Sequence, residues 1–205
     1  MIRLIPLIFL LLTSCLSPTT STTSVVQQWE PLFNGKNFKG WFPVPGGTWE
    51  VTDGMILGKS SAGEKRHGLL VTEGRYKDFT VRLKYKAVKG NSGLYFRVDT
   101  VSDAVGVHGF QAEIDPEKDA GGLYETGGRA WVVKPDSAAV ATWYKPGEWN
   151  EMSVKAAGGD ITVMVNDSVT ARLTHDPGRL EGHIALQLHG GMDMEVWFKD
   201  VEIMK

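Results

Sequence analysis

Short runs of alternating apolar and polar residues, separated by turn residues, constrain the fold of this chain more than any other feature. Successive side chains of an extended strand point to opposite faces. The stretch "DFTVRLKYKAV" (78–88) places four apolar side chains on one face: Phe79, Val81, Leu83 and Tyr85. Similar runs recur from Trp29 to Lys205, and 24 glycines and 9 prolines punctuate the chain. This pattern predicts an all-β fold, a two-sheet antiparallel β-sandwich of jelly-roll type.

Three pairs of turn residues predict tight connections between neighbouring strands. Asp53-Gly54 separates "TWEV" from "MILG", which is typical of a β-hairpin. Gly158-Gly159 and Asn166-Asp167 separate three further runs. These three runs are expected to form consecutive antiparallel strands.

Three of the predicted strands carry hydrogen-bonding side chains on the face opposite to their apolar one. These side chains are Tyr95, Arg97 and Asp99 in "NSGLYFRVD", Gln111, Glu113 and Asp115 in "HGFQAEID", and His183, Gln187 and His189 in "HIALQLH". Planar amides, carboxylates and guanidinium groups bind pairs of sugar hydroxyls, and an aromatic ring such as that of Trp131 stacks on a pyranose. The pattern therefore predicts a carbohydrate cleft on this face.

Several of these residues also have a purely structural interpretation. Arg97 could instead form an ion pair with Asp99 or Glu113. Other side chains could simply cover the sheet surface: Tyr95, Tyr124, His183, and Arg129 stacked on Trp131. His189 is the stronger histidine candidate, because the glycines that follow it let backbone approach a ligand closely.

An acidic turn follows the second of these strands. Asp115, Glu117 and Asp119 stand at alternate positions and, with loop carbonyls, are a candidate oxygen-rich site for a divalent metal such as Ca²⁺. A solvated acidic turn explains them equally well, and Lys118 weakens the metal interpretation. No other cofactor is expected.

The first residues are typical of an export signal rather than of the fold. Arg3 precedes an apolar run from Leu4 to Leu12, which is about half of the ~20 residues that a membrane-spanning helix needs. The run ends in Leu-Thr-Ser-Cys, which resembles a lipobox, so Cys15 is the expected lipidation site. The alternative is an ordinary cleaved signal peptide.

This N-terminal segment sets the expected domain organisation. Residues 1–15 are the lipoprotein signal, 16–28 a Ser/Thr-rich tether, and 29–205 one jelly-roll domain. Leu16, in place of an aspartate, favours a periplasm-facing outer-membrane anchor. A net charge of −2 and the lack of a basic run argue against nucleic-acid binding.

Several stretches, in the same order, resemble the 3-keto-disaccharide hydrolase domain family: "LFNGKNFKGW", "TWEVTDGMILG", "YKDFTVRLKYK", "GNSGLYFRVD", "GFQAEID", "KPGEWNEMSVKAAGGDITVMVNDS" and "GHIALQLHGG". The resemblance covers Pro31 to Lys205. It implies a concanavalin A-like jelly roll and an exported bacterial protein, often a lipoprotein, that cleaves glycosides already oxidised to a ketone at C3. A separate sugar oxidoreductase would supply that ketone.

The family's polar cluster corresponds here to Arg97, Gln111, Glu113, Tyr124, Gln187 and His189. Many relatives have Glu-x-Gln where this chain has Gln111-Ala112-Glu113, so the position of the essential acid stays open. Other expected substrate contacts are Tyr95, Asp115, His183, Arg129 and Trp131.

A ketone at C3 acidifies the hydrogen on C2, so its removal lets the C1 substituent leave by elimination, and water then adds. This route needs a base near C2, a donor or cation at the C3 oxygen, and an acid at the glycosidic oxygen. Glu113 or His189 is the candidate base. Arg97 or a divalent metal would stabilise the enolate, and Tyr124 or His189 would protonate the leaving group.

Two other functions are open on the sequence. One is a non-catalytic, lectin-like sugar-binding module. The other is a retaining glucanase that uses "EIDPE" (113–117), but two glutamates at i and i+4 on a strand lie about 13 Å apart. A retaining pair needs carboxyl groups about 5 Å apart.

Overall fold

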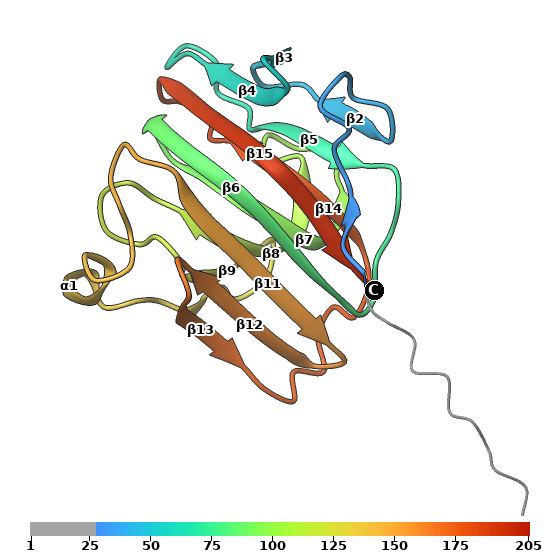
Figure 1. Cartoon of the computed structure of the whole chain (residues 1–205), viewed down its shortest axis with the longest axis vertical. Coiled ribbons are helices and arrows are strands. Elements are labelled where there is room, and N and C mark those ends of the chain that lie inside the picture. Colours follow the sequence, from blue (N-terminus) through green and yellow to red (C-terminus); the bar gives the residue numbers. More distant parts are fainter. Residues whose placement is uncertain (1–27) are drawn as a thin grey trace, which may run out of the picture.

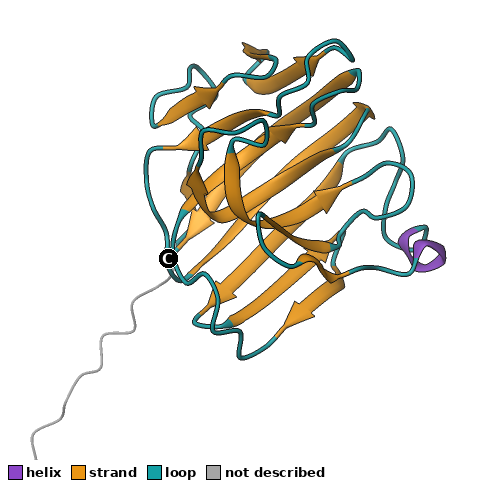
Figure 2. Ribbon diagram, turned by 180° about the vertical axis from the view of Figure 1, so that it is seen from behind, coloured by secondary structure: helices purple, strands orange, loops and turns teal. Residues whose placement is uncertain are grey.

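The computed structural model describes residues 28–205, which form two antiparallel sheets packed face to face (Figures 1 and 2). The predicted signal, the lipidation site Cys15 and nearly all of the predicted tether lie outside the described residues. Within the described part, no helix is long and apolar enough to cross a membrane.

The first sheet lies in front in Figure 1 and has the strand order β13-β12-β11-β6-β15-β4-β3, with β1 added beside β15. Its strands are β1 (Glu30–Pro31), β3 (Thr48–Thr52), β4 (Met55–Ser60), β6 (Phe79–Lys89), β11 (Asn150–Ala157), β12 (Asp160–Val165), β13 (Ser168–Leu173) and β15 (Met194–Met204).

The second sheet lies behind the first and has the order β10-β9-β8-β7-β14-β5-β2. Its strands are β2 (Trp41–Val44), β5 (Gly68–Thr72), β7 (Ser92–Thr100), β8 (Val107–Ile114), β9 (Leu123–Thr126), β10 (Ala130–Val133) and β14 (His183–Leu188). Strand β14, which is far from β5 and β7 in the sequence, lies between them. Residues far apart in the sequence therefore share one surface at the centre of this sheet.

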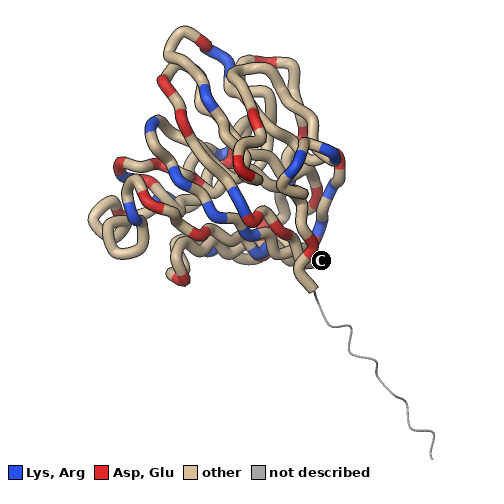
Figure 3. Tube along the Cα trace, turned by 45° about the horizontal axis from the view of Figure 1, so that its top comes forward, with Lys and Arg blue, Asp and Glu red and all other residues tan. Residues whose placement is uncertain are grey.

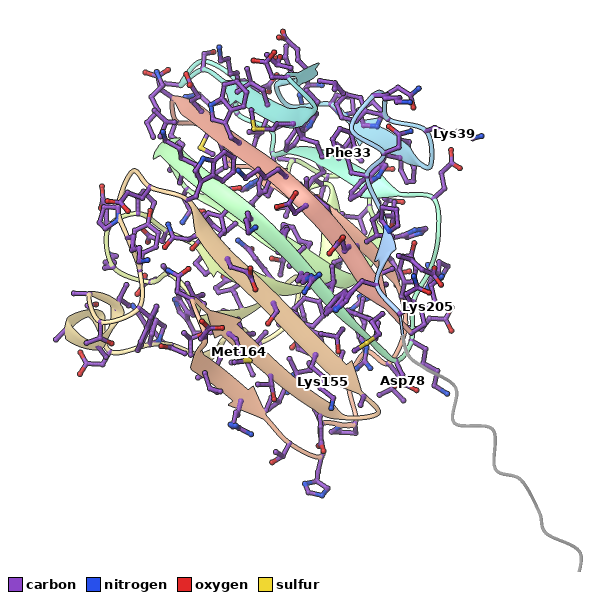
Figure 4. The ribbon with its side chains drawn as sticks, in the orientation of Figure 1. Phe33, Lys39, Asp78, Lys155, Met164 and Lys205 are labelled. Atoms are coloured by element: carbon purple, nitrogen blue, oxygen red, sulfur yellow. The ribbon has the colours of Figure 1, made fainter. Side chains whose placement is uncertain are left out.

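Apolar side chains from both sheets fill the space between them, as the alternation predicts. On β8, Phe110, Ala112 and Ile114 are buried in this core, as are the alternate apolar residues of β6. Figure 4 shows the outer side of the first sheet, where Lys155 on β11 and Met164 on β12 point away from the core. The predicted two-sheet sandwich is confirmed.

The predicted hairpins are confirmed by their backbone geometry. Asp53 and Gly54 have φ of 51° and 76° between β3 and β4, and Asn166 and Asp167 have φ of 46° and 65° between β12 and β13. Two consecutive positive φ values match the right-handed twist of the flanking strands. The only described helix is α1 (Ser137–Val140), one short turn that the strand pattern did not predict.

The predicted alternation is wrong at one place on β7. The register with β8 shifts between Phe96 and Asp99, and Arg97 has a φ of 50°. This bulge turns Arg97 towards the first sheet. It also places Val98 on the outer face, beside Tyr95 and Ala185, because an inserted residue reverses the alternation of a strand.

Charged side chains of both signs are interspersed along the chain (Figure 3). On the outer side of the first sheet, some of them form cross-strand ion pairs: Arg82–Glu202 and Lys84–Asp200. The outer side of the second sheet differs, because its central strands carry amides, imidazoles and aromatic rings.

Candidate functional site

A hollow of about 310 Å³ lies over the central strands of the second sheet, on the face turned away from the core. Residues from five strands and the turns between them line it: His67, Asn91, Tyr95, Val105, Gln111, Glu113, Tyr124, Thr126, Trp131, Gln187 and His189. The alternation positions this set, because each lining residue of β8 and β14 alternates with a core residue on the same strand.

Seven sequence-predicted residues meet in this hollow: Tyr95, Gln111, Glu113, Tyr124, Trp131, Gln187 and His189. Four other lining residues were not predicted from the sequence: His67, Asn91, Val105 and Thr126. The alternation could have indicated Asn91, because Asn91, Gly93 and Tyr95 are alternate residues and so share the outward face of β7. His67 precedes a strand that is apolar on both faces, which hid its direction.

Gly93 makes room for the side chain of Gln111. Gly93 pairs with Glu113 on the neighbouring strand β8. A β-carbon at this position would come within 2.5 Å of the Gln111 amide nitrogen. Only glycine therefore lets the Gln111 amide extend across β7.

Amide groups link the side chains at the bottom of the hollow. Gln111 Nε2 donates to Glu113 Oε2 at 3.0 Å and to Gln187 Oε1 at 3.1 Å. Gln187 Nε2 in turn lies 3.0 Å from His67 Nδ1 and 3.3 Å from the Tyr95 hydroxyl. Such a buried, connected network fixes side-chain positions before any ligand arrives.

Glu113 is the buried acid of this network. Asn91 Nδ2 donates to its Oε1 at 2.5 Å. Burial raises the pKa of Glu113 to about 8, the Asn91 bond opposes this rise, and the charges of Asp115 and Asp119 add to it. Desolvation disfavours the charged form of a carboxyl group. At neutral pH Glu113 therefore carries a proton that it can donate.

Two imidazoles stand side by side at another wall. The rings of His67 and His189 have centroids 4.4 Å apart and cross at 72°. His189 Nδ1 donates to the carbonyl of Gly190 at 2.8 Å, since a carbonyl oxygen can only accept. In the neutral ring, the lone pair is then on Nε2. Burial lowers the pKa of His67 to about 4, with a further decrease from His189 and an opposing effect of Asp103.

Aromatic side chains complete the hollow. Tyr124 and Trp131 meet edge to face with centroids 5.3 Å apart, and such rings offer apolar faces to a pyranose. Tyr95 lies at the bottom, where its hydroxyl bonds to Thr126 Oγ1 at 2.9 Å and burial raises its pKa. It therefore remains a neutral phenol.

A comparison with protein families matches residues 28–204 to the 3-keto-alpha-glucoside-1,2-lyase-like domain. The chain belongs to this family. The resemblance predicted from the sequence stretches is confirmed. Comparison with curated proteins gives no match.

Solved structures similar to this lyase-like chain support the fold. A candidate glycosyl hydrolase from Parabacteroides distasonis has a TM-score of 0.63 at 21% identity, covering 86% of this chain and 93% of that one. The carbohydrate-binding module CBM66 from Bacillus subtilis has a TM-score of 0.63 at 20% identity, covering 81% and 96%. A protein with a galectin-like fold from the same organism has a TM-score of 0.67 at 12% identity, covering 86% and 94%.

The family's polar cluster converges except for Arg97. The Arg97 guanidinium is buried and points away from the hollow. It donates to the carbonyls of Lys77, Gly158 and Arg179 at 2.6 to 3.1 Å. The prediction that Arg97 stabilises an enolate in the hollow is therefore wrong, because the β7 bulge directs its side chain towards the first sheet.

Three predicted substrate contacts also lie outside the hollow. His183 begins β14, about 20 Å along the strand from His189, and its Nδ1 faces the carbonyls of Thr72 and Gly74. Arg129 forms ion pairs with Glu125 and with Asp176, the latter at 2.6 Å. Asp115 accepts from the Glu117 backbone at 2.7 Å, in the turn that follows β8.

The acidic turn does not assemble a metal site. Among residues 28–205, no group of three His, Cys, Asp or Glu side chains lies close enough to hold an ion. Asp119 is buried with Lys134 Nζ 4.0 Å away, whereas Glu117 is exposed. A divalent metal at this turn stays a prediction.

Proposed function

We propose that this protein cleaves the glycosidic bond of 3-keto-glycosides, including 3-keto-disaccharides, by elimination across C1 and C2 followed by hydration. The observation that carries this proposal is Glu113, a buried carboxyl group with its pKa raised to about 8, in the same hollow as the imidazole of His189. Two titratable groups in different environments are the usual arrangement of an acid and a base. The chain's family membership supports the substrate class.

His189 is the proposed base. Its Nδ1 hydrogen is engaged by Gly190, so Nε2 takes the proton from C2. The electron pair of the C2–H bond moves into the enolate of the C3 ketone and then forms the C1–C2 double bond as the C1–O bond breaks. Glu113 gives its proton to the leaving glycosidic oxygen, and Tyr124 is the alternative acid. Water then adds across the double bond.

The aromatic wall supports a sugar ring as the ligand. Tyr124 and Trp131 lie on β9 and β10, next to the strand that carries Glu113. A pyranose stacked on these rings would present its polar edge to the amide network. We propose that this pose brings the reacting carbons to Glu113 and His189.

A non-catalytic sugar-binding module is the second candidate function. The similarity of the fold to that of a carbohydrate-binding module favours it. A retaining glucanase is disfavoured, because only Glu113 of the two glutamates lines the hollow and Glu117 is exposed outside it.

Incubation with a 3-keto-disaccharide and with its unoxidised counterpart separates these functions. We expect cleavage of the keto form alone. Cleavage of the plain glycoside would favour the glucanase, and binding without turnover would favour the module.

A keto sugar without a leaving group at C1, such as 1,5-anhydro-3-keto-glucitol, tests the first chemical step. In D₂O we expect the protein to exchange its C2 hydrogen for deuterium, as followed by proton NMR. His189→Asn should abolish this exchange, because an amide cannot act as the base. Unchanged exchange in this variant would remove His189 from the mechanism.

We further propose that the protein is exported and anchored through lipidated Cys15 in the outer membrane, and that it acts on products of a separate sugar oxidoreductase. The apolar run ahead of Cys15 supports the anchor. Cys15→Ser should move the protein from the membrane fraction to the soluble fraction of the cell. Retention in the membrane would contradict the anchor.

A further inference from the structure

The hydrogen-bond network of the hollow has one direction, and a backbone carbonyl fixes it. Gln111 Nε2 faces three oxygens: the Ser92 carbonyl at 3.5 Å, Glu113 Oε2 and Gln187 Oε1. The Ser92 carbonyl can only accept. With the Gln111 amide reversed, two oxygens would face each other at this point.

The donor-to-acceptor order runs from Gln111 to Gln187 and ends at His67. Because Gln187 Oε1 accepts from Gln111, its Nε2 must point to the other side, towards His67 Nδ1 at 3.0 Å. An amide nitrogen can only donate, so Nδ1 must accept. A neutral His67 then carries its single proton on Nε2.

The surroundings of His67 oppose a second proton. Protonation at Nδ1 would place that N–H against the amide of Gln187 and break the network. His189 stands against the ring at 4.4 Å and adds repulsion whenever it is charged. On the loop between β7 and β8, Asp103 is the one facing anion with an opposing effect, and burial outweighs it. On its own segment, the charges of Arg66 and Glu64 neutralise each other in an ion pair at 2.8 Å.

We propose that His67 is a catalytic residue of this site, a neutral imidazole that donates its Nε2 hydrogen to the C3 ketone oxygen of the substrate. This inference rests on the proposed function. The reaction needs a donor where the enolate charge develops, and Arg97, the sequence candidate, lies elsewhere. Neutral imidazoles polarise carbonyls in this way in other enolate-forming enzymes.

The pair of histidines then has complementary roles. His67 presents a hydrogen-bond donor and His189 a lone pair, from rings that touch. In a 3-keto sugar the ketone oxygen and the acidic C2–H are on adjacent carbons. One ring therefore serves the oxygen while the other takes the neighbouring proton.

Nitrogen-15 NMR of the imidazoles tests the protonation state without a substrate. We expect His67 to show a proton on Nε2 at pH 7 and no titration above pH about 5, given the direction of its pKa change. His183 and His189, whose Nδ1 atoms face carbonyls, serve as internal controls with the proton on Nδ1. A proton on His67 Nδ1, or titration near the ordinary histidine pKa, would overturn the inference.

Gln187→Glu sharpens this test. A carboxylate in place of the amide would accept from Nδ1, so His67 should become an imidazolium with a pKa above its ordinary value. If the His67 resonances stay those of the neutral ring, the amide does not set its protonation state and the inference fails.

Infrared spectroscopy of a bound ketone tests the catalytic contact. With 1,5-anhydro-3-keto-glucitol labelled with carbon-13 at C3, we expect the wild-type protein to lower the carbonyl stretch. His67→Ala should lose this shift and reduce kcat for a 3-keto-disaccharide by about 100- to 1,000-fold with little change in KM. His67→Gln, which keeps an N–H donor, should recover part of both.

The outcomes separate this inference from the proposed function. If the wild-type protein cleaves the keto-disaccharide but His67→Ala keeps the carbonyl shift and the rate, the inference falls and the function stands. If the wild-type protein neither binds nor cleaves keto sugars, both fall.

Discussion

At the residue scale, burial of one carboxyl group organises the chemistry of the hollow. Glu113 lies behind amide donors from Asn91 and Gln111, with most of its surface removed from water. Its pKa lies well above that of a solvated glutamate, so Glu113 keeps its proton at a pH where a solvated glutamate would have lost it. Residue type and alternation predicted this side chain, but only packing determines its pKa.

Glu113→Gln should reduce turnover of a 3-keto-disaccharide by about 100- to 10,000-fold, the usual contribution of a general acid. The amide keeps the size and hydrogen-bonding capacity of the side chain but has no proton to give. Steady-state kinetics would measure the loss, and a loss well below tenfold would remove Glu113 from the mechanism.

The same substitution should change how stability depends on pH. The unfolded glutamate loses its proton near its ordinary pKa of 4.5, and the folded one near 8. Between these values the folded state binds more protons, so the free energy of unfolding falls as pH rises and then levels off. Urea unfolding from pH 5 to pH 9 should show this decline in the wild type and a flatter profile in Glu113→Gln. Parallel profiles would contradict the raised pKa.

Asn91→Ala should raise the pKa of Glu113 further, because the hydrogen bond from Asn91 lowers it. With Glu113 as the acid, activity requires its protonated form. The alkaline limb of kcat/KM should therefore move to higher pH in the variant. An unmoved alkaline limb, with the acid limb shifted to higher pH instead, would indicate that Glu113 acts in its ionised form.

At the scale of the element, a single bulge in β7 decides which side chains reach the hollow. The alternation predicted Tyr95, Gln111 and Glu113 correctly, whereas Asp115 lies in the turn after β8. It failed for Arg97 and Val98, because a strand pattern read from sequence assumes regular pairing, whereas the extra residue depends on how β7 pairs with β8. His67 was missed for a similar reason, since its role depends on Gln187 from a strand more than 100 residues away.

Arg97→Leu tests the structural role that the bulge gives to this side chain. The substitution removes the charged donor of three part-buried carbonyls, and a hydrogen bond to a charged group contributes about 1.5–3 kcal/mol. We expect a lower free energy of unfolding by at least about 2 kcal/mol, with kcat/KM of the folded protein changed less than twofold at low temperature.

The matched control for this prediction is Arg179→Leu. Arg179 forms a partly exposed ion pair with Asp99 at 2.7 Å, and such pairs contribute less than about 1 kcal/mol. A large loss of activity with unchanged stability in Arg97→Leu would contradict the structural role and indicate that Arg97 takes part in the reaction.

At the scale of the whole molecule, the two sheets divide two tasks. The first sheet packs against the core on one side and carries ion pairs on the other, and the second presents the hollow. Composition and periodicity predicted the sandwich because its strands bury one face each. They could not predict that β5, β7 and β14 would be neighbours, which follows from the topology.

Salt should have little effect on the reaction. The net charge is only −2, charges of both signs are interspersed, and a 3-keto-disaccharide is neutral. Long-range electrostatic steering is therefore weak. Raising the ionic strength tenfold should change kcat/KM less than twofold. A steep salt dependence with this neutral substrate would contradict the expectation.

The attachment of β1 has a mechanical consequence. This strand is only two residues long, pairs with β15 near the C-terminus, and includes Pro31, which has no N–H to donate. A pulling force transmitted from the N-terminal side would meet this short pairing first. Strand β1 would therefore detach from β15 first, while the interior of the sandwich and the hollow on the second sheet keep their shape.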